Sequence, residues 1–112
     1  YYAPDVVLYD AQLPDLYRGR EALLKNFSAQ LEKVKSIKVE ITEFDAGSEG
    51  DTGYAFGRQR AVITSKDGTI MEVRFRVTDI LKKINGKWLI THEHISYPAD
   101  AATGKTAFNN PF

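Results

Sequence analysis

The residues best suited to chemistry lie in one segment near the C-terminal end, residues 85–96. It contains both histidines of the chain, His92 and His94, with Glu93 between them. The segment opens on Asn85-Gly86, a tight-turn signal because both residue types tolerate positive φ, and continues as a half-apolar strand. The sequence therefore places ionisable groups on a sheet rather than in a loop.

A further ionisable group, Asp79, falls on a predicted apolar sheet face. Residues 52–64 and 69–84 form a predicted hairpin around Asp67-Gly68. A loop of two or four residues puts even positions of the first strand on the face of odd positions of the second. Asp79 then needs an ion-pair partner, for which Arg58 is the candidate, or its pKa rises. The shared face carries Tyr54, Phe56, Arg58, Arg60, Val62, Val73, Phe75, Val77 and Asp79.

The turn at Asn85-Gly86 leaves two registers open for the partner of Asp79. A two-residue loop pairs Asp79 with His92 and turns both histidines into the pocket. A three-residue loop with a glycine bulge pairs Asp79 with Glu93 and turns the histidines outward. In the second register the outer face also carries Arg74, Arg76, Ile80, Trp88 and Ile90.

The charged and histidine side chains of these strands could also form ion pairs or a metal site. Arg74 and Arg76 are expected to form ion pairs with Glu72 and Glu93 on a solvated or interface face. The two histidines and Asp79 could share a metal ion, but their spacing is not that of zinc proteases and no fourth ligand stands out. We therefore predict no metal site and no cofactor.

The elements that position these groups follow from the hydrophobic pattern. Apolar residues recur at helical spacing over residues 19–34 and alternate with polar residues in the strands. Long hairpins after one helix predict an α+β fold with the helix on one face of a bent antiparallel sheet. We expect a strand at 6–9, a loop at 10–18, a helix at 19–34, strands at 37–42, 52–64, 69–84 and 87–96, and a polar turn at 46–51.

Composition excludes several classes of function. Fifteen basic and fifteen acidic residues give zero net charge, so no basic field attracts nucleic acid or anionic lipid. There is no cysteine, which excludes disulfides and thiol chemistry. No apolar run approaches the length of a membrane span. We expect a cytoplasmic protein, while the start at Tyr1 rather than Met leaves N-terminal processing open.

Three motifs resemble one known family. Residues 86–96 read G-K-W-x-I-x-H-x-H-x-S, residues 3–10 resemble an "A-D-D-x-x-x-x-D" strand entry, and residues 16–22 resemble a "Y-x-G-R-x-A" helix start. These are similar to the nuclear transport factor 2-like superfamily, which includes SnoaL-like cyclases, ketosteroid isomerases and the calcium/calmodulin-dependent kinase association domain. The resemblance implies a cystatin-like α+β roll. It also implies one domain over 1–112 whose start lies after the family's first helix.

The resemblance also implies roles for individual residues. Asp10 matches the catalytic base of the isomerases, and Asp79 falls near their second, protonated carboxyl. Tyr17 or Tyr54 could replace the oxyanion tyrosine of the missing helix. The alternative for Asp10 is a turn cap after a strand, a common place for aspartate. The remaining predicted ligand-binding residues are Phe56, Arg58, Phe75, His92, Glu93 and His94.

Two functions from different classes follow. The first is a cofactor-independent isomerase or cyclase that acts on a small apolar or carbonyl-containing molecule with Asp10 as general base. The alternative is a non-catalytic ligand-binding or oligomerisation module of the same fold. We also predict a homodimer, because an apolar outer sheet face can be closed by a two-fold copy of itself. The apolar residues near the two ends of the chain also need to pack against something, for which a partner subunit is one candidate. They are Tyr1, Tyr2, Phe108 and Phe112.

Overall fold

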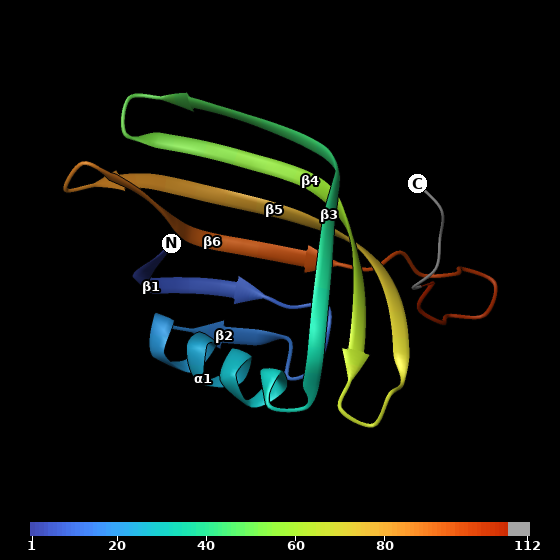
Figure 1. Ribbon diagram of the computed structural model, residues 1–112. Helices are drawn as coiled ribbons and strands as arrows, with labels where there is room; N and C mark the ends of the chain where they lie inside the picture. The colour runs from blue at the N-terminus through green and yellow to red at the C-terminus, as the bar shows by residue number, and fades with distance from the viewer. Residues whose placement is uncertain (108–112) are drawn as a thin grey trace.

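One long, strongly bent sheet and a single helix make up the computed structural model, which describes residues 1–107 (Figure 1). The six strands are ordered β2-β1-β6-β5-β4-β3. This arrangement confirms the predicted α+β roll. Phe108 and Phe112 lie outside the described residues. The elements are β1 Tyr2–Tyr9, β2 Leu16–Arg18, α1 Arg20–Leu31, β3 Val34–Glu49, β4 Thr52–Ser65, β5 Ile70–Ile84 and β6 Lys87–Ser96.

The pairing of β1 with β6 differs from the prediction. The two strands run parallel, with Leu8 opposite Glu93 and Tyr9 opposite His94, whereas the other pairs are antiparallel. An antiparallel sheet throughout was therefore the wrong expectation. Turn signals predict only pairs joined by a short loop, whereas β1 and β6 meet after the helix and four other strands have intervened. The parallel pairing brings the start of the chain beside the His92–His94 segment.

The helix is held against β1 by a small apolar core. Gly19, at φ 88°, precedes the helix, and its N–H donates to the carbonyl of Val6 at 2.8 Å. Leu23 packs with Val6 and Leu8, and all three are fully buried. The helix ends at Leu31 rather than at the predicted Val34. The predicted loop 10–18 contains β2, which pairs with the outer edge of β1.

β3, β4 and β5 all bend along their length, and β3 turns most sharply (Figure 1). β3 extends well beyond the predicted 37–42, so the polar stretch 46–51 contributes only the turn at Gly50-Asp51. Between Ile41 and Glu43 the register shifts by one residue, a bulge that increases local bending. Gly57 lies opposite, and a side chain there would collide with the carbonyl oxygen of Glu43. Glycine is therefore required where the two strands turn.

The β4–β5 hairpin has the opposite parity from the prediction. Ser65 N–H donates to the carbonyl of Thr69 at 2.8 Å, which leaves a three-residue loop, Lys66-Asp67-Gly68. An odd loop pairs even positions with even positions, so Tyr54 lies opposite Ile80 and Ala55 opposite Asp79. The expected sharing of one face by Tyr54 and Asp79 was therefore wrong.

The β5–β6 hairpin combines features of both registers considered. Its turn is a two-residue loop, since Ile84 pairs with Lys87. A bulge then places Ile90 opposite Leu81 but Glu93 opposite Asp79. Asp79 therefore meets Glu93, as in the bulge register. The bulge lies at Thr91 instead of the turn, so Trp88 and Ile90 lie on the face of Asp79 and not, as predicted, on the outer face with Ile80.

These registers define two faces of the sheet. The helix-facing face carries Leu8, Asp79 and Glu93, together with the core of α1. The outer face carries Tyr54, Ile80 and His92. Within residues 1–107, no helix has the length and apolar character needed to cross a membrane.

Candidate functional site

A pair of carboxyl groups forms the centre of the candidate site. Asp79 of β5 and Glu93 of β6 are opposite neighbours on the helix-facing face. Glu93 is only 7% exposed, and it is the one buried polar or charged residue among residues 1–107. The hydroxyl of Tyr2 donates to Oε1 of Glu93 at 3.0 Å. Oδ1 of Asp79 is buried, and among residues 1–107 it has no hydrogen-bond donor other than a proton on Glu93.

Burial dominates the electrostatics of this pair. It raises the pKa of Glu93 to about 8, helped by the hydrogen bond with Asp79, by the charge of Asp79 and, most weakly, by Asp10. The donation from Tyr2 acts in the opposite direction. Burial and the neighbouring Glu93 also raise the pKa of Tyr2, so its hydroxyl keeps its proton. Glu93 is therefore mostly a neutral acid at pH 7, a hydrogen-bond donor in an apolar site.

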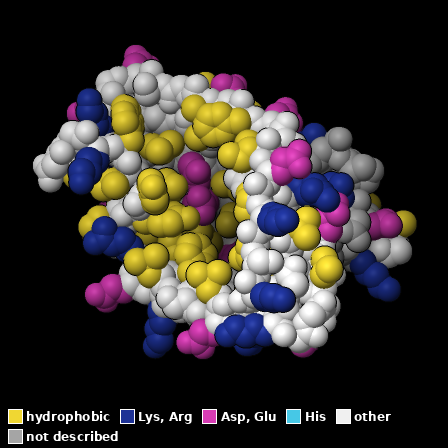
Figure 2. Space-filling view, viewed as in Figure 1, with side chains coloured by type: hydrophobic (Ala, Val, Ile, Leu, Met, Phe, Trp, Pro, Cys, Tyr) yellow, Lys and Arg dark blue, Asp and Glu magenta, His cyan; other side chains and the backbone are white. Residues whose placement is uncertain are grey.

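The surroundings of the pair are apolar. Asp79 lines a small cavity of about 30 Å³ together with Phe44, Ala55 and Val77. Beside it lies a larger cleft of about 400 Å³, which shares Phe44 and Ala55 and extends to Trp88. Figure 2 shows a hollow lined mainly by hydrophobic side chains, with acidic atoms at its centre. Such concave apolar sites with a few polar groups are typical of small-molecule binding.

The structure brings together only part of the predicted site. Glu93, Phe75 and Tyr17 lie on the helix-facing face with Asp79, and Tyr17 packs against the core beside Leu8. The other predicted ligand-binding residues lie on the outer face because the β4–β5 loop has three residues and β6 has a bulge at Thr91. The predicted ligand-binding residues on the outer face are Tyr54, Phe56, Arg58, His92 and His94.

Asp10 follows the last residue of β1 and is half-buried. Its Oδ1 accepts a hydrogen bond from the backbone N–H of Gln12 at 3.4 Å, the turn-cap contact considered as the alternative. Its charge also helps to raise the pKa of Glu93 and of Tyr17. Asp10 is therefore near the carboxyl pair, and its role as a base stays a prediction.

Tyr2 is a member of the site that sequence reasoning did not identify. It is 91 residues from Glu93 in the chain, and only the parallel pairing of β1 with β6 makes them neighbours. The available signal was a tyrosine at the start of an apolar strand, since a buried tyrosine hydroxyl usually finds a hydrogen-bond partner.

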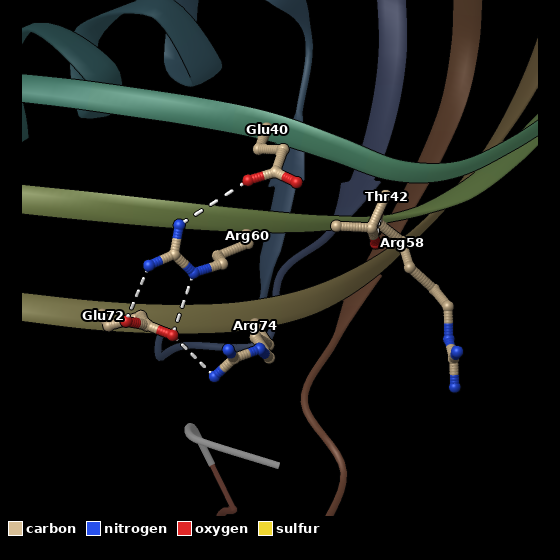
Figure 3. Close-up of polar contacts among 6 residues, drawn as sticks. All are labelled: Glu40, Thr42, Arg58, Arg60, Glu72 and Arg74. Atoms are coloured by element: carbon tan, nitrogen blue, oxygen red, sulfur yellow. Dashed lines mark hydrogen bonds and ion pairs between the residues drawn. The ribbon is translucent and has the colours of Figure 1, made fainter. Parts of the chain in front are cut away.

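The arginines of the outer face form their own ion-pair network (Figure 3). Arg60 binds Glu72 through two 3.0 Å hydrogen bonds, and Arg74 reaches the same carboxylate at 2.7 Å. The predicted Arg74–Glu72 pair is confirmed. Arg76, expected to pair with an acid, instead donates to Oγ of Ser96, and Glu93 lies on the other face.

The predicted Arg58–Asp79 ion pair is wrong, because the β4–β5 register places the two residues on opposite faces. Arg58 pairs with Glu43 at 3.5 Å, and its carbonyl oxygen accepts a hydrogen bond from Thr42 (Figure 3). Among residues 1–107, no ion pair joins a guanidinium to the carboxyl pair.

The histidines are part of an aromatic cluster on the outer face. The ring of Tyr9 lies 4.8 Å from His92 and 5.8 Å from His94, edge to face. Nδ1 of His92 is 2.8 Å from the carbonyl oxygen of Val7. Asp79 lies on the opposite face, so it cannot join the histidines as a ligand. Across residues 1–107, no group of three potential metal ligands comes together.

Comparisons with known proteins agree with this fold. The chain is similar to a nuclear transport factor 2-like protein of unknown function from Pseudomonas putida KT2440, with 24% identity and a TM-score of 0.86 over 99% of this chain and 78% of that one. It is 30% identical, with a TM-score of 0.74, to a Xanthomonas campestris protein provisionally assigned as a calcium/calmodulin-dependent protein kinase II association domain, over 85% of this chain and 67% of that one. A nuclear transport factor 2-like superfamily protein from Salmonella enterica matches 96% of this chain and 78% of its own, at 20% identity and a TM-score of 0.78.

Curated protein sequences provide no match. The model of one protein family matches residues 1–100, which include the carboxyl pair and its apolar surroundings. The chain belongs to the SnoaL-like domain family, and it has the fold of nuclear transport factor 2-like proteins.

Proposed function

We propose that the helix-facing hollow binds a small carbonyl compound and moves a proton next to its carbonyl group, as an isomerase or cyclase without a cofactor does. The observation that carries the proposal is the buried Asp79–Glu93 pair, which lies on an apolar face with no ion-pair partner among residues 1–107. A neutral carboxyl in a dry site donates a hydrogen bond to a developing oxyanion, often the largest single catalytic contribution.

The proposed roles divide between three groups. Glu93, with the pKa raised to about 8, holds the proton and shares it with Asp79, and the pair donates to the ligand oxygen. Tyr2 fixes the orientation of Glu93 through its 3.0 Å hydrogen bond. Asp10, whose charge reaches the pair, is the proposed base that removes the proton from carbon.

Proton exchange at carbon tests this proposal. Cyclohexanone is incubated with the protein in deuterium oxide, and loss of the α-hydrogen signal is followed by proton NMR. We expect exchange faster than in buffer, and about a hundredfold slower with Asp10→Asn, since general bases contribute at least that much. An Asp79→Asn, Glu93→Gln double variant should lose exchange as well. Glu72→Gln, on the outer face, is the matched control and should exchange like the wild type. Equal rates in all proteins would contradict the proposal and favour a binding module.

The outer face supports a second proposal, assembly into a homodimer. Aromatic or aliphatic side chains lie on four adjacent strands of this face. Tyr54 and Phe56 stack with ring centres 6.0 Å apart on β4, Ile80 lies opposite Tyr54, and Tyr9 lies against the histidines. All four remain more than 40% exposed. The 30% identical association-domain protein is named for assembly. A two-fold copy of the same surface would cover these residues.

Analytical ultracentrifugation tests the dimer. The wild type should sediment as a dimer at micromolar concentration, and Ile80→Glu should sediment as a monomer because it buries a charge at the centre of the patch. Val39→Glu is the matched control. It changes an exposed apolar residue of the helix-facing face and should remain a dimer. A wild-type monomer that does not change on dilution would contradict the proposal.

A further inference from the structure

We propose that Arg58 and Arg76, on the outer face of the sheet, bind the carboxylate of a small molecule at a site separate from the helix-facing hollow. The two arginines lie directly opposite each other on β4 and β5. They line a groove of about 330 Å³ together with Phe56 and Thr78. The proton transfer proposed above uses none of these residues, so this inference does not depend on it.

A second cross-strand pair of arginines on the same face shows how such a pair is stabilised. Arg60 lies directly opposite Arg74. Like charges directly opposite each other destabilise a sheet. Here the carboxylate of Glu72 lies between the two guanidinium groups, with Oε1 3.0 Å from Arg60 and 2.7 Å from Arg74 (Figure 3). The protein therefore neutralises this pair with a carboxylate of its own.

No carboxylate among residues 1–107 bridges Arg58 and Arg76 in the same way. Figure 3 shows the side chain of Arg58 extending away from the Glu72 network. Arg76 donates from Nε to Oγ of Ser96 at 3.1 Å. Because that contact uses only Nε, the two terminal nitrogens of Arg76 are available to a ligand. A carboxylate from outside the chain can therefore take the place that Glu72 has in the first pair.

The position of this carboxylate follows from the register. Glu72 lies two residues from one arginine of its pair on β5 and diagonal to the other across the hairpin. Thr78 has the same relation to Arg76 and Arg58. Threonine is short and uncharged, so the space that a glutamate side chain fills beside the first pair is part of the groove beside the second.

The charge of the groove favours a singly charged ligand. Glu43 is 3.5 Å from Arg58, and 62% of its side chain is exposed, so this ion pair contributes little to stability. Its charge nevertheless offsets one of the two arginines and leaves a net charge of one. Guanidinium groups match the planar, two-oxygen geometry of a carboxylate. A monocarboxylate fits these properties better than a doubly charged phosphate.

Benzoate is the probe for this site. It is titrated into nitrogen-15-labelled protein at constant ionic strength, and the Nε–H signals of the arginines are followed by NMR. The signals of Arg58 and Arg76 should shift and saturate, while those of Arg60 and Arg74 should not. These signals report on the outer face, so benzoate in the hollow would not imitate the result. Inorganic phosphate, titrated at the same ionic strength, should bind more weakly.

Two variants remove the site in different ways. Arg76→Gln should bind benzoate roughly tenfold more weakly, read from the Arg58 signal, because charge-assisted hydrogen bonds are lost. Its matched control is Arg74→Gln, which changes an arginine of the bridged pair and should bind like the wild type. Thr78→Glu should also bind roughly tenfold more weakly, because a tethered carboxylate competes at high effective concentration. Thr78→Gln adds the same bulk without the charge and should keep the affinity of the wild type.

Circular dichroism establishes that each variant is folded before titration. The proposal is overturned if the Arg58 and Arg76 signals do not saturate, if Arg74→Gln weakens binding as much as Arg76→Gln, or if Thr78→Glu and Thr78→Gln behave alike. Tighter binding of phosphate than of benzoate would refute the carboxylate class. Binding to the Ile80→Glu monomer but not to the wild type would show that a second copy covers the groove, and would overturn the proposal for the natural protein while the homodimer stands.

Discussion

Leu23→Ala is expected to lower the free energy of unfolding by about 3 kcal/mol or more. Leu23, Val6 and Leu8 are the largest fully buried side chains of the described residues, and Leu23 is the only one of the three contributed by α1. Removing its side chain leaves a cavity between the helix and β1. Because small domains are stable by only about 5–15 kcal/mol, the loss is a large share of the total.

Leu24→Ala is the matched control for this prediction. The two leucines are adjacent in α1 and have the same helix propensity, but Leu24 is 47% exposed. Its truncation should cost less than about 1 kcal/mol. Urea unfolding followed by Trp88 fluorescence measures both variants. Equal losses would show that the helix is not held by the Val6–Leu8–Leu23 core.

Glu93→Gln is expected to change how stability depends on pH. The pKa of Glu93 is about 8 in the folded protein, against 4.5 for an ordinary exposed glutamate. Between these values the folded state binds more protons than the unfolded state, so stability falls as pH rises. The contribution is complete below about pH 4.5 and is lost by the time the pH passes 8. The slope due to Glu93 approaches at most about 1.4 kcal/mol per pH unit.

Glutamine keeps the size of Glu93 but cannot lose a proton, so the variant should lack this slope between pH 5 and 8. Glu72→Gln serves as the control. Arg60 lowers the pKa of Glu72, mainly through its hydrogen bonds. Glu72 therefore loses its contribution to stability only at acidic pH. Above pH 5, the stability of Glu72→Gln should depend on pH as that of the wild type does. Urea unfolding at half-unit pH intervals provides the measurement. A wild-type slope identical to that of Glu93→Gln would contradict the prediction.

Much of the fold could be predicted because its signals are local. The apolar positions of the helix and the alternation in the strands are contained in short windows, and the Asn85-Gly86 turn forms where expected. The three motifs near 3–10, 16–22 and 86–96 then indicated the family, whose model matches residues 1–100. The extra strand β2 and the full length of β3 lacked such a signal, since they form by pairing with β1 and β4.

The site was harder to predict because it depends on parity. At Asp67-Gly68 the side chain of Asp67 accepts a hydrogen bond from the N–H of Thr69 at 2.9 Å, which favours a three-residue loop that the Asp-Gly signal does not distinguish from a two-residue loop. One residue reversed the faces of Tyr54, Phe56 and Arg58 relative to Asp79.

The bulge at Thr91 had the same effect on β6. It placed Glu93 beside Asp79, as one of the two registers allowed, but it also moved Trp88 and Ile90 to the helix-facing face. No residue type marks this position as a bulge. The apolar cleft that extends to Trp88 and the role of Tyr2 therefore emerge only from the three-dimensional structure, although Asp79 and Glu93 were both among the predicted residues.

The most direct test of the central claim is the titration of the Glu93 carboxyl group. Glutamate labelled with carbon-13 at the side-chain carboxyl is incorporated, the Glu93 signal is assigned by comparison with Glu93→Gln, and its chemical shift is followed from pH 3 to pH 10. The buried pair predicts a pKa of about 8 for Glu93, which Asp79→Asn should lower by removing the neighbouring charge. A Glu93 carboxyl that titrates near 4.5, like an exposed glutamate, would contradict the account.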